Sequence, residues 1–270
     1  MPRRHTISEM TCILLADGSR VCVEDLVGNG ADGYVIRKGS HVMKIPILVG
    51  ELRADGSIEA DPDNERLVTH LEMEKQIYER LRHVPGVAEC IESTSNGILL
   101  TYYPNGAMSE YLARCTEAPL ATQRMEWILQ ATDTIARCHQ RGVLIFDIAL
   151  RNFLLADDLT LRLIDFSNSS LLPPDTNIVE ANADGCTVQV DLLHLSSVIY
   201  SICTWRAFSV SCNTHSEWPD LEQMPDLSRL DLGPMIQNCW ERKYTSAEEL
   251  LQDLRLCTNS SVPQEPPSGT

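Results

Sequence analysis

The chain has 270 residues, 43% of them hydrophobic, which is enough to bury a core in one two-lobed domain or in two small domains. Its 22 Lys and Arg stand against 38 Asp and Glu, and the resulting formal charge of -16 repels nucleic-acid backbones and anionic lipids. The composition therefore argues against a nucleic-acid partner and against binding to a membrane surface.

The ten cysteines include no C-x-x-C pair and no secretory signal precedes them, which indicates reduced thiols in an intracellular protein, cytoplasmic or nuclear. No apolar run approaches the roughly 20 residues that a membrane span requires.

The first part of the chain is rich in β-type patterns. Residues 1–20 combine a basic start with a turn signal, which favours a small strand pair or a loosely attached arm without chemistry. Residues 21–46 are short β-rich runs broken by glycine, and residues 64–82 carry apolar positions at helical spacing. These patterns predict three strands followed by a helix. The acidic stretch between them, residues 49–63, is expected to be an extended loop because it contains the Asp55-Gly56 turn signal.

Two further strands are predicted at residues 87–91 and 97–103, and the turn signal Pro104-Asn105-Gly106 marks a lobe boundary after them. Helical patterns dominate the rest of the chain. The predicted helices cover residues 109–115, 123–141, 190–203 and 246–256.

These elements predict an α+β fold with two lobes, a small β-rich N-lobe that carries one helix and a larger helical C-lobe. We expect an N-terminal arm at residues 1–20 and one domain at 21–257, with the N-lobe at 21–103 and the C-lobe at 104–257. The tail, residues 258–270, is rich in proline and serine and is expected to be disordered.

The segment Ile145-Phe146-Asp147-Ile148-Ala149-Leu150-Arg151-Asn152 is the most informative part of the sequence. Asp165-Phe166-Ser167 begins thirteen residues after Asn152. Carboxylate and amide oxygens are hard ligands that suit Mg²⁺, so Asp147, Asn152 and Asp165 are spaced as phosphoryl transfer from Mg-ATP requires. The alternative interpretation is a pair of turns with ordinary acidic residues.

A glycine-rich turn and a lysine strand precede this segment. Gly28, Gly30 and Gly33 would let the backbone approach phosphate oxygens, and Val35 would cover a nucleotide base, although a plain glycine-rich hairpin has the same pattern. Lys44 lies in an apolar strand, where a bare ammonium is costly unless an anion meets it. It could instead end the strand with its head group in water.

A carboxylate on the following helix is the natural partner for Lys44. Glu72 and Glu74 both lie on that helix, and Glu74 shares the register of its apolar face at Ile77 and Leu81. We therefore predict a Lys44–Glu74 pair, whereas an unpaired helix glutamate would remain a solvated surface charge.

From about residue 21 to residue 256 these features resemble the eukaryotic protein kinase family. The resemblance implies that Gly28, Gly30 and Gly33 cover the phosphates of ATP and that Lys44, held by Glu74, contacts the α- and β-phosphates. It also implies an adenine pocket that has Leu100 at its back and the residues from Thr101 to Tyr103 as its hinge.

For the second half of the site, the resemblance implies that Asp147 orients the acceptor hydroxyl and accepts its proton, while Asn152 and Asp165 bind Mg²⁺. Asp191, which opens a predicted helix, is similar to the family's aspartate that anchors the catalytic loop. The closing helices around Cys239-Trp240 resemble those of divergent kinase-like proteins of the filamentous-fungal type.

The sequence departs from the family pattern at several positions. Ile145-Phe146 replaces His-Arg before the catalytic aspartate, and Ser167 replaces a glycine, which would stiffen the hinge after Asp165. No Ala-Pro-Glu lies between Asp165 and Asp191, so little room is left for a peptide-docking platform. Arg151, a candidate catalytic residue, stands where tyrosine kinases have Ala-Ala-Arg-Asn, and the loop therefore does not reveal the acceptor amino acid.

The leading hypothesis is an ATP- and Mg²⁺-dependent protein kinase, a transferase that acts on a serine or threonine hydroxyl of a protein substrate. Two alternatives remain. A nucleotide-binding pseudokinase scaffold fits the lost regulatory residues, and a small-molecule kinase of the aminoglycoside or choline type would need no peptide platform. The substrate and the oligomeric state are not encoded in any pattern that we find.

Overall fold

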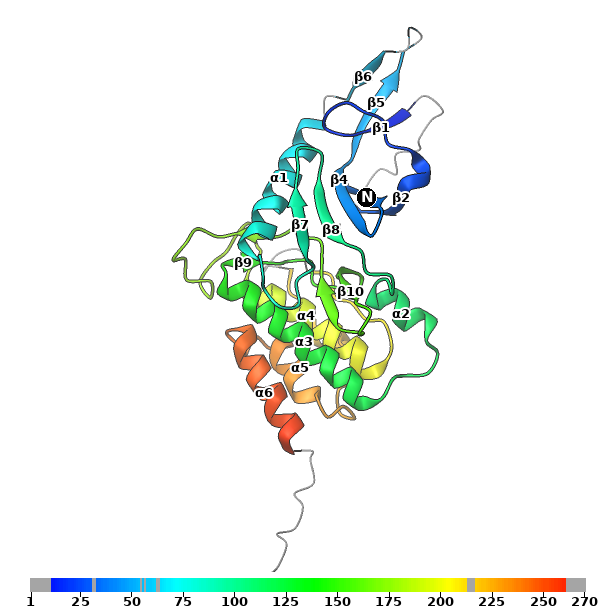
Figure 1. Cartoon of the computed structure of the whole chain (residues 1–270). Coiled ribbons are helices and arrows are strands. Elements are labelled where there is room, and N and C mark those ends of the chain that lie inside the picture. Colours follow the sequence, from blue (N-terminus) through cyan, green and yellow to red (C-terminus); the bar gives the residue numbers. More distant parts are fainter. Residues whose placement is uncertain are drawn as a thin grey trace, which may run out of the picture. The chain divides into compact units, whose positions relative to one another are not determined.

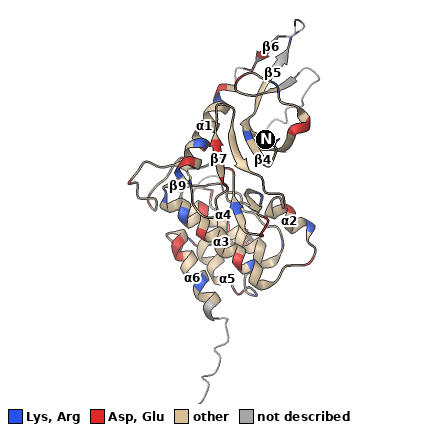
Figure 2. Cartoon of the chain, in the orientation of Figure 1, with Lys and Arg blue, Asp and Glu red and all other residues tan. Residues whose placement is uncertain are grey.

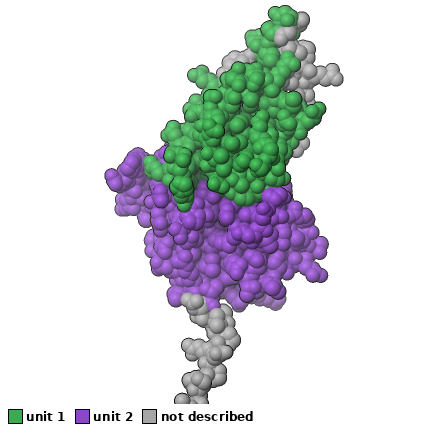
Figure 3. Space-filling view, viewed as in Figure 1, with its two compact units in different colours: residues 1–83, 88–103, 165–167 green, residues 84–87, 104–164, 168–270 purple. Residues whose placement is uncertain are grey.

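The computed structural model describes residues 11–30, 33–53, 55, 57–61, 64–212 and 217–260. The chain divides into two compact units, which Figure 3 colours separately. Unit 1 comprises residues 1–83, 88–103 and 165–167, and unit 2 comprises residues 84–87, 104–164 and 168–270. The chain passes from unit 1 to unit 2 after His83, after Tyr103 and after Ser167.

Unit 1 contains a five-stranded antiparallel sheet with the strand order β2-β3-β4-β8-β7. Its strands are β2 (Leu26–Asn29), β3 (Gly33–Lys38), β4 (His41–Pro46), β7 (Cys90–Ser93) and β8 (Ile98–Thr101). A short 3-10 turn, η1 (Val23–Asp25), precedes β2, and helix α1 (Asn64–Arg80) lies between β4 and β7 in the chain. The three strands predicted within residues 21–46 and the helix predicted within residues 64–82 are confirmed, but further strands lie between them. Ile13, Ile36 and Ile45 form a buried apolar cluster in unit 1.

The extended loop expected at residues 49–63 is wrong. Strands β5 (Leu48–Leu52) and β6 (Ile58–Ala60) form there and make a second sheet with β1 (Thr11–Leu14), in the order β1-β5-β6 (Figure 1). The physical reason is that an Asp-Gly pair between apolar, β-branched runs is a hairpin signal rather than only a loop signal. Asp55 supports the turn because its Oδ1 accepts the amide of Ser57 at 2.9 Å.

Unit 2 is mainly helical. Its helices are α2 (Met108–Arg114), α3 (Ala121–Gln140), α4 (Val188–Thr204), α5 (Gly233–Trp240) and α6 (Ala247–Ser260), with a short 3-10 turn η4 (Leu221–Gln223). Helix α4 lies beside α3 and α5, and Asp191 is the only Asp, Glu, Lys or Arg that it contains (Figures 1 and 2). A helix that is apolar all round is a core helix, and most residues of α4 are buried.

Short strands hold the loops of unit 2 in place. Strand β9 (Val143–Leu144) pairs with β12 (Ser170–Leu171), and β10 (Phe153–Leu155) forms a hairpin with β11 (Leu161–Leu163). The loop between β9 and β10 contains Asp147 and ends in the 3-10 turn η2 (Leu150–Asn152). Both ends of this loop are thus fixed by strand pairing.

The end of the chain differs from its prediction. Helix α6 continues to Ser260, so the first three residues of the tail expected to be disordered are helical, and residues 261–270 lie outside the described part. In the described part of the chain, no helix combines the length and the apolar character needed to cross a bilayer. None of the nine cysteines whose side chains are described forms a disulfide.

Candidate functional site

A buried ion-pair cluster lies in unit 1. Lys44 Nζ is 2.8 Å from each carboxylate oxygen of Glu74 and 2.6 Å from Oδ1 of Asp165. The side chain of Glu74 is 1% exposed and that of Lys44 is 11% exposed. The predicted Lys44–Glu74 contact is therefore confirmed, and Asp165 is a second partner of the same ammonium.

The electrostatics of this cluster follow from burial and from the two carboxylates. Burial opposes the charged form of Lys44, but the charges of Glu74 and Asp165 outweigh it, and the pKa of Lys44 is raised. Burial raises the pKa of Glu74, with Lys44 acting against it. Burial also acts to raise the pKa of Asp165, but the charge of Lys44 and the hydrogen bonds from Lys44 and Ser167 outweigh it, and the pKa of Asp165 is lowered. At neutral pH the cluster thus holds a charged ammonium.

The backbone after Asp165 is tied to the same cluster. Phe166 N donates to Glu74 Oε1 at 3.1 Å, and the Phe166 ring lies edge-on to Tyr78 with centroids 4.9 Å apart. Ser167 donates its hydroxyl to Asp165 Oδ1 at 2.8 Å, a contact that the glycine of the family pattern could not make. Three donors converge on Oδ1, and among the described residues none donates to Oδ2.

The glycine-rich turn joins β2 to β3, and its residues Ala31 and Asp32 lie outside the described part. A Cβ added at Gly33 would come within 2.8 Å of the Ile45 carbonyl oxygen, so the fold itself requires glycine there. At Gly28 and Gly30 a Cβ would meet only ordinary contacts, at 3.5 and 3.6 Å. Packing within the chain therefore does not explain these two glycines. Val35 pairs with Gly28 on one side and with Lys44 on the other.

The predicted hinge follows β8. Thr101 donates its amide to the Glu89 carbonyl at 3.0 Å, and its hydroxyl to the Glu89 carboxylate at 3.1 Å. The Tyr103 hydroxyl accepts the Glu89 amide at 3.2 Å, so the ring of Tyr103 is turned toward the start of β7. Within the described residues the backbone N–H of Tyr103 has no partner, which leaves a donor for an outside acceptor.

The predicted catalytic loop lies in unit 2. Arg151 binds both carboxylate oxygens of Asp147, at 2.5 and 2.7 Å, with the arginine side chain 62% and the aspartate 25% exposed. Asn152 is buried, and its side-chain Nδ2 donates hydrogen bonds to the backbone carbonyl of Asp147 at 2.8 Å and to Asp147 Oδ2 at 3.2 Å. Asp147, Arg151 and Asn152 are thus brought together, and no donor from the described part of the chain reaches the Asn152 side-chain oxygen.

Asp191 anchors this loop from α4, as predicted. It is fully buried and accepts the amides of Ile145 at 2.8 Å and Phe146 at 2.6 Å, one on each carboxylate oxygen. His139, at the end of α3, also bonds to Asp191, through Nε2 at 2.8 Å. The sequence interpretation missed His139, although its place on the buried face of α3 was a usable signal, because a buried imidazole needs a polar partner.

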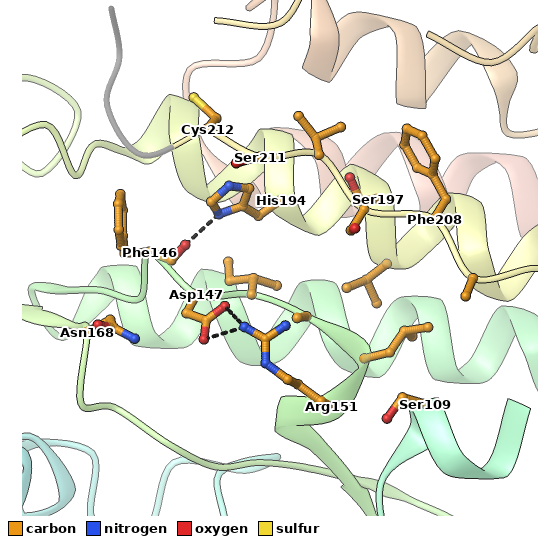
Figure 4. Close-up of a pocket in the computed structure, with 17 residues that line it drawn as sticks. Ser109, Phe146, Asp147, Arg151, Asn168, His194, Ser197, Phe208, Ser211 and Cys212 are labelled. Atoms are coloured by element: carbon orange, nitrogen blue, oxygen red, sulfur yellow. Dashed lines mark hydrogen bonds and ion pairs between the residues drawn. The ribbon is translucent and has the colours of Figure 1, made fainter. Parts of the chain in front are cut away.

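A cavity of about 680 Å³ opens beside Asp147 within unit 2. It is bordered by the catalytic loop, by α4 and by the segment after α4. Figure 4 shows the Arg151 guanidinium facing the Asp147 carboxylate at one wall, with His194, Ser197 and Phe208 across from them. Its described wall combines hydroxyl and apolar side chains with one carboxylate and one guanidinium.

A comparison with known families decides the assignment. A family model described as protein tyrosine and serine/threonine kinase matches residues 21–195, which is more than half of the chain. The chain belongs to this protein kinase family. The two-lobed α+β class predicted from the sequence agrees with it, with the β-rich unit first and the helical unit second.

Curated relatives of this kinase domain are similar over parts of their length. The serine/threonine-protein kinase LMTK1 of Mus musculus is 30% identical over 226 residues, 80% of this chain and 15% of that protein. The NUAK family SNF1-like kinase 1 of Homo sapiens is 24% identical over 157 residues, which are 57% of this chain and 23% of that protein. The serine/threonine-protein kinase PKH2 of Saccharomyces cerevisiae is 27% identical over 119 residues, covering 43% and 11%. The chain therefore spans less than a quarter of each of these relatives.

The kinase domain departs from the family pattern just before Asp147, as the sequence indicates. At the positions of His-Arg, Ile145 is buried and Phe146 adopts a positive φ of 65°. Asp147 N donates to Ile145 O at 2.8 Å across this residue, which closes a tight turn. A phenylalanine is strained at positive φ, so the turn depends on contacts that hold it.

We expect Asp191→Asn to destabilise the kinase domain by roughly 3 kcal/mol or more. The asparagine oxygen can accept only one of the two buried backbone N–H groups, and the other N–H would face the side-chain NH2 group, which does not accept a hydrogen bond. Denaturant unfolding followed by circular dichroism measures this change. The matched control is Asp184→Asn, an exposed position in the same unit, which should change the free energy of unfolding by less than about 0.5 kcal/mol. Equal effects of the two substitutions would contradict the anchoring role.

Proposed function

We propose that the chain is an active protein kinase that transfers the γ-phosphate of ATP, in a Mg²⁺-dependent reaction, to a serine or threonine hydroxyl of a protein. The observation that carries this proposal is the buried Lys44–Glu74–Asp165 cluster. Burying three charged groups is costly, and a fold gains nothing from it that an apolar trio would not supply. A site that handles phosphate and a divalent cation does need them.

The residues of unit 1 fit ATP. A side chain would fit at Gly28 and at Gly30 without a clash inside the chain. Glycine at these positions therefore suits a loop whose backbone must approach phosphate oxygens. One donor is already used, however, because Gly30 N bonds to Gly33 O at 2.8 Å. Lys44 offers the ammonium for the phosphates, and the N–H of Tyr103 offers a hydrogen-bond donor for the adenine ring.

The residues also fit Mg²⁺. Magnesium is held in such enzymes by one or two protein oxygens together with phosphate oxygens, so a dense carboxylate cluster is not needed. Among the described residues no group of three His, Cys, Asp or Glu could hold a metal. Within unit 1 we propose Asp165 Oδ2 as a cation ligand, and within unit 2 we propose the side-chain oxygen of Asn152. Bound there, Mg²⁺ would neutralise charge on the transferred phosphoryl group.

In the proposed reaction, Asp147 orients the acceptor hydroxyl and takes its proton. Arg151 and Asn152 hold the Asp147 carboxylate from one side, which fixes its direction without using all of its lone pairs. Lys44 is held in turn by Glu74. The chain's contribution is therefore positioning and charge compensation.

The proposal of a serine or threonine acceptor is supported by two relatives that are named serine/threonine-protein kinases. A pseudokinase scaffold is the second candidate. The observation that favours it is that Lys44 and Asp147 are both engaged by side chains of the chain itself, Lys44 by two carboxylates and Asp147 by Arg151 Nη2, which contacts both of its carboxylate oxygens.

The deciding experiment measures transfer from γ-labelled ATP with Mg²⁺, first to the protein itself and then to a mixture of serine, threonine and tyrosine peptides. Label on serine or threonine supports the proposal, and label on tyrosine alone would correct the acceptor. Stabilisation by Mg-ATP in a thermal-shift assay, with no transfer to any acceptor, would identify a pseudokinase. Label that appears only when an aminoglycoside or choline is added would indicate a small-molecule kinase.

A further inference from the structure

His194 lies one turn after Asp191 on helix α4, on the side that meets the catalytic loop. Its Nδ1 is 2.5 Å from the carbonyl oxygen of Phe146, the residue directly before Asp147 (Figure 4). A carbonyl oxygen only accepts, so Nδ1 carries the proton in this contact. Residues three apart on a helix share a face, which explains why Asp191 and His194 reach the same loop.

The two side chains hold one strained residue from both ends. Asp191 accepts the amide of Phe146 at 2.6 Å, and His194 donates to its carbonyl. Phe146 has a φ of 65° and forms the centre of the turn that Asp147 N closes onto Ile145 O. Such a conformation persists only where the surroundings fix it, and here both backbone polar groups of Phe146, its N–H and its C=O, are held by side chains of α4.

The orientation of Asp147 depends on this turn. The Phe146 carbonyl belongs to the peptide bond that leads into Asp147, and that bond is planar, so fixing the carbonyl also fixes the Asp147 amide. The carbonyl of Ile145 is less dependent on a single contact, because it accepts both Asp147 N and Ser169 Oγ, at 2.8 and 3.1 Å. His194 is the only described donor to Phe146 O.

We propose that His194 is a positioning residue for Asp147, which acts from α4 through its hydrogen bond to the carbonyl oxygen of Phe146. This inference rests on the proposed kinase activity for its kinetic consequence, but its structural part does not. His194 also lines the cavity beside Asp147, so the same imidazole connects the catalytic turn to the wall of that cavity.

The test compares His194→Asn, His194→Gln and His194→Ala in the full chain. An asparagine places its amide nitrogen near the position of Nδ1, whereas glutamine places it one bond further out, near Nε2. We expect His194→Asn to retain the contact with Phe146 O. In the other two variants, kcat should fall by up to about a hundred-fold, as a misplacement of about 1 Å produces, with the KM for ATP unchanged.

A second readout does not need turnover. Amide hydrogen exchange in the segment that covers Ile145 to Asp147 should accelerate by roughly tenfold in His194→Ala and His194→Gln, as expected for one lost hydrogen bond, and should stay near the wild-type rate in His194→Asn. Ser169→Ala is the matched control, because Ile145 O keeps its second donor, and its exchange and kcat should remain close to those of the wild type.

The outcomes separate this inference from the proposed function. If the wild type transfers no phosphate, the proposed function fails, and the exchange data alone decide the role of His194. If exchange in His194→Ala equals that of the wild type, or if glutamine rescues as well as asparagine, the positioning role is refuted even in an active enzyme.

Discussion

Asp147→Asn should lower γ-phosphate transfer by about 10²–10⁴-fold, the range that removal of a positioned general base produces. The carboxylate would become an amide of the same shape, which cannot take the acceptor proton. Asn152 would keep its 2.8 Å bond to the backbone carbonyl of residue 147, so the loop should retain its conformation. The loss of the Arg151 pair should cost little stability, since that arginine side chain is 62% exposed.

The control for this substitution is Asp157→Asn, an exposed carboxylate in the turn before β11 of the same unit. It makes the same chemical change and should leave the rate unchanged. Initial rates with labelled ATP measure transfer, and a thermal-shift titration with Mg-ATP measures binding, which should be similar in all three proteins. Equal transfer rates for Asp147→Asn and the wild type would remove Asp147 from its assigned role.

The sequence predicted the Lys44–Glu74 contact because the argument was local and energetic. An ammonium in an apolar strand needs an anion, and the register of α1 with Ile77 distinguished Glu74 from Glu72. The structure supports this distinction, because Glu72 bonds instead to Lys75 at 2.5 Å, on the same helix. The prediction for Asp191 succeeded for a different reason, namely the resemblance to a family whose helix begins with that aspartate.

Other contacts of the site could not be predicted from the sequence in the same way. The contact of Lys44 with Asp165 joins residues 121 positions apart, and that of His194 with Phe146 spans 48 positions. No periodicity encodes such distances, because they depend on how separate elements pack. The β5–β6 hairpin is different, since its Asp-Gly signal was in the sequence and was interpreted as a loop signal.

Lys44→Met should destabilise the protein by about 3–5 kcal/mol, because it leaves the buried carboxylate of Glu74 without its counter-charge. The methionine fills a similar volume, so loss of packing adds little to this cost. Lys38→Met, at the exposed end of β3, is the matched control and should change the free energy of unfolding by less than about 0.5 kcal/mol. Urea unfolding at neutral pH measures both variants, and similar midpoints would contradict the structural role of the cluster.

The pH dependence of this cost has a defined sign. The pKa of Glu74 is already raised in the folded wild type, through burial, and loss of Lys44 removes the charge that opposes this rise. A carboxyl group with a raised folded pKa is better tolerated when protonated, so its destabilising effect appears as the pH rises through that pKa. The loss of unfolding free energy in Lys44→Met should therefore shrink as the pH is lowered and be largest at neutral pH.

Adding Glu74→Gln to Lys44→Met should recover part of the lost stability, because the double variant no longer buries that unpaired charge. A double variant less stable than Lys44→Met alone would show that Glu74 stabilises the fold through contacts other than Lys44, of which the Phe166 amide is the leading candidate.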